Sequence, residues 1–360
     1  MRITFVIPFV NLTGGIRVLL NHANWLHDEG HLVTVVYPLW PYRFQLKQRD
    51  RLFEFRKQWR SAPRVEWCDL RCRLLRVPYL ANRFVPPGDL VLATSWPTAH
   101  SVARLHASRG TKVHIVFHHE SGTGPEHRIC RTYSLPFHRI ALSTSVREMV
   151  EQRFGCEIHG IVPAGVDTTL FFPDHGGRSQ NTVLMLYHND PRKGAGDGIE
   201  ALALLRKRRP DVQIRMCGTV RPERLPSWIR FDFHPSDSDL RRRYSRSTVF
   251  LYPSRYEGFG LPPLESMACA CPVVTTEVGA VPEFATDRCN ALIVQPCDVR
   301  GMAGRLEELL LNPGLRNRLA ERGLETAARY AMIRIAPLFG EALRHAFEGD
   351  SQATLRGAIA

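Results

Sequence analysis

The sequence lacks any hydrophobic run of the length that a membrane-spanning helix needs, about 18–20 consecutive apolar residues. The apolar stretch at residues 3–10 is short, and the glycine pair Gly14-Gly15 follows it at the start of a helical pattern. We therefore expect a first β-strand there rather than a secretion signal. An integral membrane protein is not among the classes that these residues predict.

A paired cysteine framework is also missing. The nine cysteines are an odd number scattered along the chain, which favours reduced thiols in the cytoplasm over a disulfide-stabilised secreted fold. Two close pairs exist, Cys68 with Cys72 and Cys269 with Cys271, but no second cysteine or histidine pair follows at zinc-ligand spacing. We therefore expect no structural metal site.

Acidic residues are in deficit. The chain has 48 lysines and arginines against 35 acidic residues, which gives a net charge of +13. Much of the excess lies between Arg43 and Arg76, where eleven basic residues stand against four acidic ones, a net charge of 11 − 4 = +7. No nucleic-acid-binding motif accompanies this segment, so we expect no nucleic-acid partner.

A helix predicted for residues 44–60 would place Leu52, Phe55 and Trp59 on one face. Arginines flank this face, and acidic side chains lie opposite: Arg49, Arg51, Arg56 and Arg60, then Asp50 and Glu54. An apolar stripe edged by arginine fits the surface of an anionic membrane, contacted through residues 43–76. It fits equally well a helix that packs the stripe on its own domain.

The rest of the chain alternates short apolar strands with helical segments, the pattern of doubly wound α/β domains, and 360 residues suit two of them. The loop at residues 11–15 is not a full G-x-G-x-x-G, so Gly14 and Gly15 also fit a plain sharp turn. A polar, Gly-rich linker at 175–179 predicts the domain boundary. We expect a first domain at 1–174 with a basic insert at 38–88, a second domain at 175–334, and a last helix and tail at 335–360.

The most informative stretch is residues 254–265, Ser-Arg-Tyr-Glu-Gly-Phe-Gly-Leu-Pro-Pro-Leu-Glu. It follows an apolar strand at 248–252 and leads into a helix predicted from residue 262, with the two prolines in its first turn. Free N–H groups at a helix start suit a phosphate, and Glu257 and Glu265 can accept hydrogen bonds from hydroxyls on either side of it. Two surface glutamates around a structural turn are the plain alternative.

The full string from Pro253 to Ala268, Pro-Ser-x-x-Glu-Gly-Phe-Gly-Leu-Pro-x-x-Glu-Ser-Met-Ala, resembles the donor-binding signature of the retaining family 4 glycosyltransferases, the glycosyl transferases group 1. The likeness is strong over 248–311, moderate over 140–194 and only topological over 1–110. It implies the GT-B fold, an α/β fold with two Rossmann-like doubly wound domains facing a central cleft.

The resemblance implies transfer of a hexosyl group from a nucleotide diphosphate sugar to an acceptor hydroxyl, with retention at the anomeric carbon. The acceptor would be a glycan or lipid-linked molecule, in the synthesis of cell-surface glycans or glycolipids. No metal and no cofactor are implied, because cationic side chains neutralise the departing diphosphate, which itself takes the acceptor's proton. The implied place is the cytoplasm, at the inner face of the cell membrane if the basic segment docks there.

The resemblance also assigns site residues. The catalytic ones are His118, Lys193 and Glu257. The donor-binding ones are Gly14, Gly15, Arg192, Phe259, Gly260, Leu261 and Glu265. The residue types agree with these roles, since Lys193 and Arg192 can supply positive charge to a diphosphate. Glu257 can accept from sugar hydroxyls and Glu265 from the ribose.

Two positions depart from the family pattern. The strand-end arginine expected six residues before Lys193 is Tyr187, so either Arg192 or the helix end must supply the second positive charge. After the strand at 112–117 the chain reads Phe-His-His-Glu, where a subset of the family has Gln-His-Tyr-Glu, and the register favours His118 over His119. A histidine that is merely hydrogen-bonded at a strand end is the plain alternative.

Other functions stay open from the sequence. Tyr187 favours a nucleotide-sugar-binding protein that has lost catalysis, and nucleotide-sugar epimerases and phosphorylases share the related two-domain fold. Residues 237–239, Asp-Ser-Asp, resemble the D-x-D metal motif of another glycosyltransferase fold. Their place at a predicted helix start makes capping the expected role.

Overall fold

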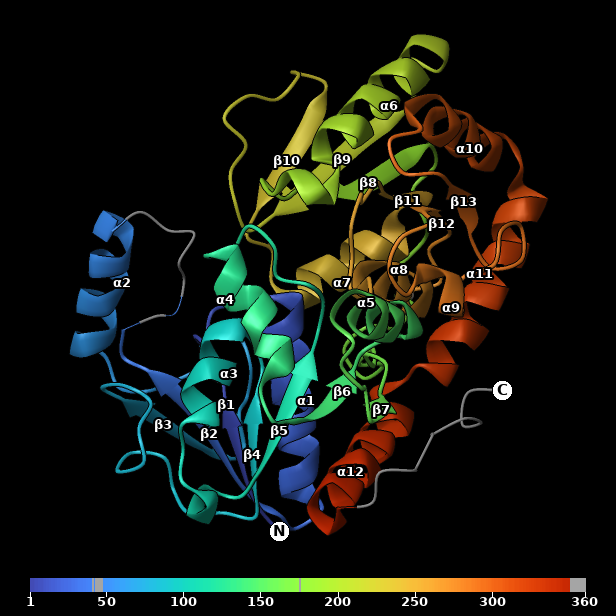
Figure 1. Ribbon diagram of the computed structural model, residues 1–360. Helices are drawn as coiled ribbons and strands as arrows, with labels where there is room; N and C mark the ends of the chain where they lie inside the picture. Colours follow the sequence, from blue (N-terminus) through green and yellow to red (C-terminus); the bar gives the residue numbers. More distant parts are fainter. Residues whose placement is uncertain (41, 43–47, 175, 350–360) are drawn as a thin grey trace. The chain divides into compact units, whose positions relative to one another are not determined.

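The structure, a computed structural model, describes residues 1–40, 42, 48–174 and 176–349 (Figure 1). The start of the helix expected at residue 44, the first residue of the linker expected at 175, and most of the expected tail lie outside the described residues. The chain divides into two compact units, residues 1–164 with the helix from Ile335 onwards, and residues 165–334. Each unit is described by itself, and the cleft expected between them stays a prediction.

The first domain is built on a seven-stranded parallel sheet of order β3-β2-β1-β4-β5-β6-β7. The strands are β1 (Arg2–Val6), β2 (Leu32–Pro38), β3 (Arg73–Val77), β4 (Leu90–Ala93), β5 (Thr111–Val116), β6 (His138–Ala141) and β7 (Gly160–Ile161). The helices are α1 (Gly14–Asp28), α2 (Gln48–Arg60), α3 (Trp96–Ala103), α4 (Glu126–Arg131), α5 (Thr144–Phe154) and α12 (Met332–Glu348), with short 3-10 turns η1 (Ala107–Arg109) and η2 (Thr132–Ser134). Central strands are continuously apolar because helices cover both sheet faces.

The second domain repeats this architecture with a six-stranded parallel sheet of order β10-β9-β8-β11-β12-β13. The strands are β8 (Thr182–Leu186), β9 (Gln213–Gly218), β10 (Ile229–Phe233), β11 (Val249–Tyr252), β12 (Val273–Thr276) and β13 (Leu292–Val294). The helices are α6 (Ala195–Arg208), α7 (Asp237–Arg246), α8 (Leu261–Ala268), α9 (Val281–Phe284), α10 (Val299–Leu311) and α11 (Pro313–Arg329), with the 3-10 turn η3 (Pro191–Lys193). The two doubly wound α/β domains predicted from the sequence are confirmed.

Two elements were not predicted, and both have a physical reason. Strand β3 lies inside the basic insert, where Arg73 and Arg76 interrupt the apolar pattern because β3 is a partly exposed edge strand next to β2. Helix α4 has six residues, too few for a helical repeat to show in the sequence.

The division between the units falls at residue 164 rather than at 174. Segment 165–174 packs on the second domain, since the Val166 N–H donates to the Tyr330 carbonyl at 2.9 Å and the Phe171 ring lies 6.2 Å from that of Tyr244. Helix α12 packs on α1 of the first domain, where Phe339 stacks on His22 with ring centroids 4.2 Å apart. Among the described residues, no helix is long and apolar enough to cross a membrane.

Candidate active site

The stretch at 254–265 forms the strand–turn–helix unit that its sequence predicts. Strand β11 ends at Tyr252, and Gly260 stands at the N-cap of α8 with φ +97°, a conformation that favours glycine. The helix begins at Leu261, one residue before the predicted start, and the prolines at 262 and 263 occupy its first turn, where no intrahelical N–H partner is needed. Prolines carry no N–H, so the N–H groups that this helix start can offer to an anion are those of Gly260 and Leu261, together with the positive end of the helix dipole.

The Glu257 carboxylate is held by three donors from its own domain. The Lys193 ammonium lies 2.8 and 2.9 Å from its two oxygens, and the Ser254 hydroxyl donates to it at 2.8 Å. The Tyr252 hydroxyl donates as well. Burial and the negative charge of Glu257 raise the pKa of Tyr252 well above its usual value, so this phenol stays a neutral donor.

Lys193 reaches Glu257 because of where η3 ends. Gly194 follows with φ +63°, and a Cβ there would lie 1.9 Å from the Pro253 carbonyl oxygen. Only glycine lets the loop after β8 lie against the turn after β11. The Arg192 carbonyl accepts the N–H groups of Arg255 and Tyr256 at 2.8 and 3.1 Å, which fastens the two loops together.

Arg192 is not an unpaired second cation. Its guanidinium binds Asp190, with Nη2 2.7 Å from Oδ2, and this contact lowers the pKa of Asp190 to about 2. The remaining nitrogen, Nη1, is buried without a hydrogen-bond partner among the described residues. Tyr187 packs edge-on against Phe231 with ring centroids 6.0 Å apart, as a core side chain does. Lys193 is thus the cation of this loop that meets Glu257 directly.

Among the other predicted donor-binding residues, one offers a polar side chain and two have side chains packed in the core. Glu265 is buried on α8, and the Tyr244 hydroxyl donates to it at 3.3 Å. Phe259 is buried against Phe284 and Tyr330, with centroids 5.6 and 6.1 Å apart, so its ring serves packing. Leu261 is buried too, which leaves the backbone of this turn to meet a ligand.

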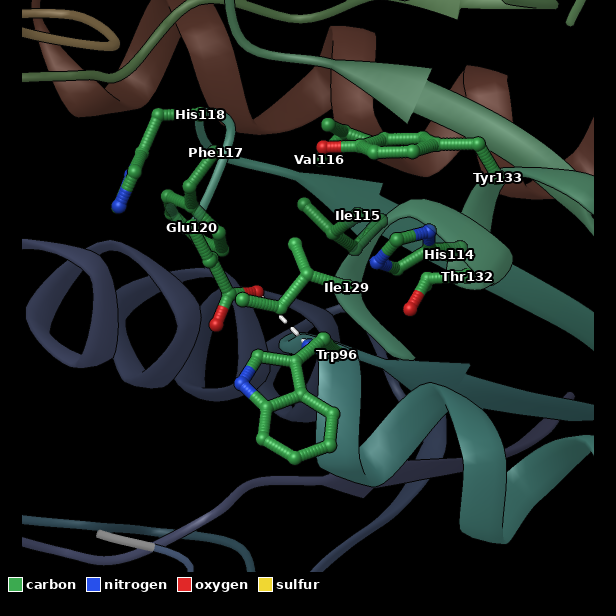
Figure 2. Close-up of a pocket in the computed structure, with 10 residues that line it drawn as sticks. All are labelled: Trp96, His114, Ile115, Val116, Phe117, His118, Glu120, Ile129, Thr132 and Tyr133. Carbon is green, nitrogen blue, oxygen red and sulfur yellow. Dashed lines mark hydrogen bonds between the residues drawn. The ribbon is translucent and has the colours of Figure 1, made fainter. Parts of the chain in front are cut away.

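In the first domain, His118 and His119 have different surroundings. Figure 2 shows a small pocket after β5 that His118 lines together with Trp96 and Glu120, whose carboxylate accepts the Trp96 N–H at 2.8 Å. His119 is buried outside this pocket, where its ring nitrogens lie 2.9 Å from Glu126 and 3.2 Å from the Tyr133 hydroxyl. His119 therefore fits the structural role, and His118 stays the predicted site residue.

The glycine pair at the start of α1 lies beside this segment. A Cβ at Gly15 would lie 3.4 Å from the Phe117 ring, next in sequence to His118, whereas a Cβ at Gly14 would meet nothing within 4 Å. The Thr13 hydroxyl caps the helix by accepting the Ile16 N–H at 3.3 Å. Gly15 thus lies against Phe117, the residue before His118, in the first domain, whereas Lys193 and Glu257 are in direct contact in the second.

Two acidic clusters could be taken for metal sites. The ligand atoms of His119, Glu126 and Cys130 lie within 4.8 Å of one another, but the hydrogen bond from His119 and the Arg153 guanidinium at 3.7 Å account for the position of Glu126 without an ion. At 237–239, the Ser236 hydroxyl accepts the Asp239 N–H at 3.1 Å and forms a capping box. Helix capping, as expected, explains this motif.

Sequence reasoning missed the groups that support the predicted residues. Tyr252 and Ser254 bind Glu257, Asp190 binds Arg192, and Trp96 binds Glu120. Ser254 lies in the stretch from Pro253 to Ala268 that resembles the family signature, so the sequence could have pointed to it. The other contacts join side chains whose directions only the fold decides.

Comparison with known proteins agrees with this geometry. Residues 169–326 match the family Glycosyl transferases group 1. The chain is 35% identical over 179 residues to the MMP alpha-(1->4)-mannosyltransferase of Mycolicibacterium hassiacum, a match that covers 46% of this chain and 43% of that protein. The chain thus spans less than half the length of this relative.

Two further comparisons extend over nearly the whole chain. The phosphatidyl-myo-inositol mannosyltransferase of Mycolicibacterium smegmatis is 28% identical over 356 residues, 92% of this chain and 90% of that protein. The crystal structure of HepE from Anabaena in complex with UDP and glucose superposes with a TM-score of 0.74 at 16% identity, covering 96% of this chain and 99% of that one. The chain thus shares the fold of that structure, with two parallel-sheet α/β domains, and residues 169–326 carry its similarity to the glycosyl transferases group 1.

Proposed function

We propose that the protein transfers a hexosyl group from a nucleotide diphosphate sugar to an acceptor hydroxyl, with retention at the anomeric carbon. The observation that carries the proposal is the contact of Lys193 with Glu257, shortly before the start of α8 at Gly260 and Leu261. Lys193 follows β8 and Glu257 follows β11, and these strands are neighbours in a parallel sheet, so both lie at its carboxyl edge. Positive charge, N–H donors and a carboxylate at one edge are what a sugar diphosphate needs.

In the proposed reaction, the bond between the anomeric carbon and the diphosphate oxygen breaks, and its electron pair leaves with the diphosphate. Lys193 and the N–H groups of Gly260 and Leu261 at the start of α8 stabilise that charge, and Glu257 accepts hydrogen bonds from the sugar hydroxyls. The acceptor oxygen bonds to the anomeric carbon on the face that the diphosphate leaves, and a phosphate oxygen takes its proton. Glu265 binds the ribose hydroxyls. Neither a metal nor a protein base is needed in this scheme.

For the first domain, we propose that His118 and the α1 start at Gly15 face the transferred sugar. The pocket of Figure 2 supports this, since His118 and Glu120 line it together at the carboxyl end of β5. Parallel sheets bind their ligands beyond such strand ends.

The acceptor and the place of action follow from the names of the relatives and from α2. Two relatives are named mannosyltransferases and one of these names contains a phosphatidylinositol, so mannose and lipid acceptors are the first to test. On α2, Phe53 and Trp59 are 70% and 67% exposed, while Phe55 packs on Trp40 at 5.4 Å. Of the predicted stripe, Phe55 thus contacts its own domain and Trp59 stays exposed, while Phe53, which lies outside the stripe, adds a second exposed ring. We propose that these rings and their flanking arginines dock on an anionic membrane at the cytoplasmic face.

A second candidate function is a nucleotide-sugar-binding protein without turnover. The observations that favour it are Tyr187, which supplies no charge, and the pairing of Arg192 with Asp190, which occupies the cation next to Lys193. The contact of Lys193 with Glu257 argues against a binding protein without turnover, because it keeps a cation at the site.

A donor panel screened by thermal shift tests the proposal, because a ligand that binds only the folded state raises the unfolding temperature, and more so the further its concentration exceeds its Kd. We expect one class of nucleotide diphosphate sugar to stabilise the protein and to be hydrolysed slowly without an acceptor. Lys193→Ala should lose the hydrolysis. Tight binding with no turnover on any acceptor would support the binding protein instead, and a sugar phosphate or an epimerised donor would overturn both.

A further inference from the structure

A groove of about 680 Å³ lies on the second domain, away from the candidate donor site. Its lining includes residues 178–181, which precede β8, and Thr248, which precedes β11. The groove is therefore at the amino edge of the sheet, whereas Lys193 and Glu257 follow the carboxyl ends of the same two strands. Its other wall is the end of α10 and one face of α11, which Figure 1 labels. The volume lies within the range of small-molecule sites.

Two arginines from distant parts of the chain meet at this groove. The Arg178 guanidinium donates through Nη2 to the Ala270 carbonyl at 2.6 Å. The Arg316 guanidinium donates through Nη1 to the Leu309 and Leu310 carbonyls at 2.6 and 2.8 Å, at the last turn of α10. Each side chain is thus fixed by backbone on one side. Its other nitrogens have no hydrogen-bond partner within the part of the chain that the structure describes.

The two arginines also lack acidic partners among the described residues, unlike Arg255, which binds Asp197 at 2.6 Å. Burial, and then the positive charge of Arg178, lower the pKa of Arg316. Two like charges held near each other at a groove destabilise the empty site, and an anion between them relieves that repulsion. Fixed guanidinium groups with unused N–H donors suit a phosphate, which they can bind in a bidentate manner.

The remaining lining residues narrow the ligand class. The hydroxyl of Ser179 and the amides of Gln180 and Asn317 can exchange hydrogen bonds with hydroxyl groups, and Leu310, Pro313 and Leu324 offer apolar contact. Glu321 lines the groove as well, and its carboxylate disfavours a second negative group. We propose that this groove binds a small organic monophosphate with a hydroxylated body, the phosphate lying between Arg178 and Arg316.

Isothermal titration with inorganic phosphate, glycerol 3-phosphate and a hexose 6-phosphate, at fixed ionic strength, tests the proposal; the free hexose is the neutral control. We expect at least one phosphate ester to bind the wild type and Lys193→Ala alike, because the candidate donor site is not involved. Arg178→Gln with Arg316→Gln should weaken binding at least about tenfold, through lost charge-assisted hydrogen bonds. Arg318→Gln, an exposed position of α11 outside the groove, makes a charge change of the same kind and should leave binding within about twofold.

A second variant keeps the test independent of folding, since both arginines also cap helices. Ala320→Glu adds a negative charge to the groove lining and leaves the arginine–carbonyl contacts in place. It should weaken binding at least about tenfold while the unfolding temperature stays near that of the wild type. The proposal is overturned if no phosphate ester binds, if Lys193→Ala removes binding, or if Ala320→Glu leaves the affinity unchanged.

Discussion

The contact between Lys193 and Glu257 makes a quantitative prediction about the second domain. Glu257→Gln keeps the shape of the side chain but replaces one acceptor oxygen by an N–H₂ group. Every group around that carboxylate is a donor: Lys193 Nζ, the Ser254 hydroxyl and the Tyr252 hydroxyl. The new amide therefore places a donor against a donor whichever way it is turned, and the ion pair is lost.

The magnitude follows from burial. The Glu257 side chain is 9% exposed, so its hydrogen bonds are worth more than surface contacts, whereas Lys193 is 36% exposed and its charge is partly screened. We expect Glu257→Gln to lower the free energy of unfolding by about 1–2 kcal/mol. For a domain of this size, that corresponds to a decrease of about 2–8 °C in unfolding temperature.

A double-mutant cycle measured by thermal unfolding isolates the pair. Lys193→Met removes the same ion pair from the other side, so its effect and that of Glu257→Gln should not add, with a coupling of about 0.5–2 kcal/mol. Lys207→Met, at an exposed position of α6 that makes no hydrogen bond or ion pair with Glu257 among the described residues, should combine additively with Glu257→Gln. Additive effects of Lys193→Met and Glu257→Gln would refute the reasoning, because they would show that the two side chains do not interact.

Three further variants test other parts of the structure. Gly194→Ala should lower the unfolding temperature and abolish donor hydrolysis, because its Cβ would lie 1.9 Å from the Pro253 oxygen and displace Lys193. His22 is fully buried and its pKa falls to about 3, so the unfolded chain binds the proton more tightly and stability falls as pH drops below about 6.5. The free energy of unfolding, measured with urea, should therefore fall by about 2 kcal/mol less between pH 7 and pH 5 in His22→Leu than in the wild type. Phe53→Ser with Trp59→Ser should weaken sedimentation with anionic liposomes, and added salt should weaken it in the wild type.

Each of these has a matched control. Gly196→Ala changes a helical glycine whose Cβ would meet nothing within 4 Å, and it should be harmless; equal damage from both variants would contradict the Gly194 argument. His27→Gln, on the exposed face of α1, should keep the wild-type pH dependence, and an unchanged dependence in His22→Leu would refute the assignment. Ile333→Ser removes another exposed apolar side chain, 76% exposed, and should not affect liposome binding. Liposome binding that does not depend on lipid charge would contradict the proposed docking on an anionic membrane.

The order of strands and helices in both domains followed from apolar runs bounded by glycine, proline and capping residues. The strand–turn–helix unit around Glu257 also followed from the sequence, because the glycines and prolines that mark its boundaries lie within the stretch itself. Strand β3 was missed since Arg73 and Arg76 give an edge strand the composition of a loop. The start of α8 was predicted to within one residue, because prolines are common in a first helical turn.

Contacts around the site were harder to predict than the elements that carry it. From its place beside Lys193, Arg192 was predicted to supply a second positive charge to the diphosphate, but its guanidinium binds Asp190, two residues earlier. Nothing in the sequence says that the Tyr252 ring points along the strand end to Glu257 rather than into the core. The likeness to a family supplied the roles of Lys193 and Glu257, and the fold supplied their partners.

The configuration of the first sugar released from the donor tests the central claim most directly. Proton NMR can follow hydrolysis of the donor selected by thermal shift, with wild type and Lys193→Ala side by side. We predict that the wild type releases a nucleoside diphosphate and a sugar whose first-formed anomer is that of the donor, and that Lys193→Ala releases neither. An inverted first anomer, or hydrolysis undiminished in Lys193→Ala, would contradict this prediction.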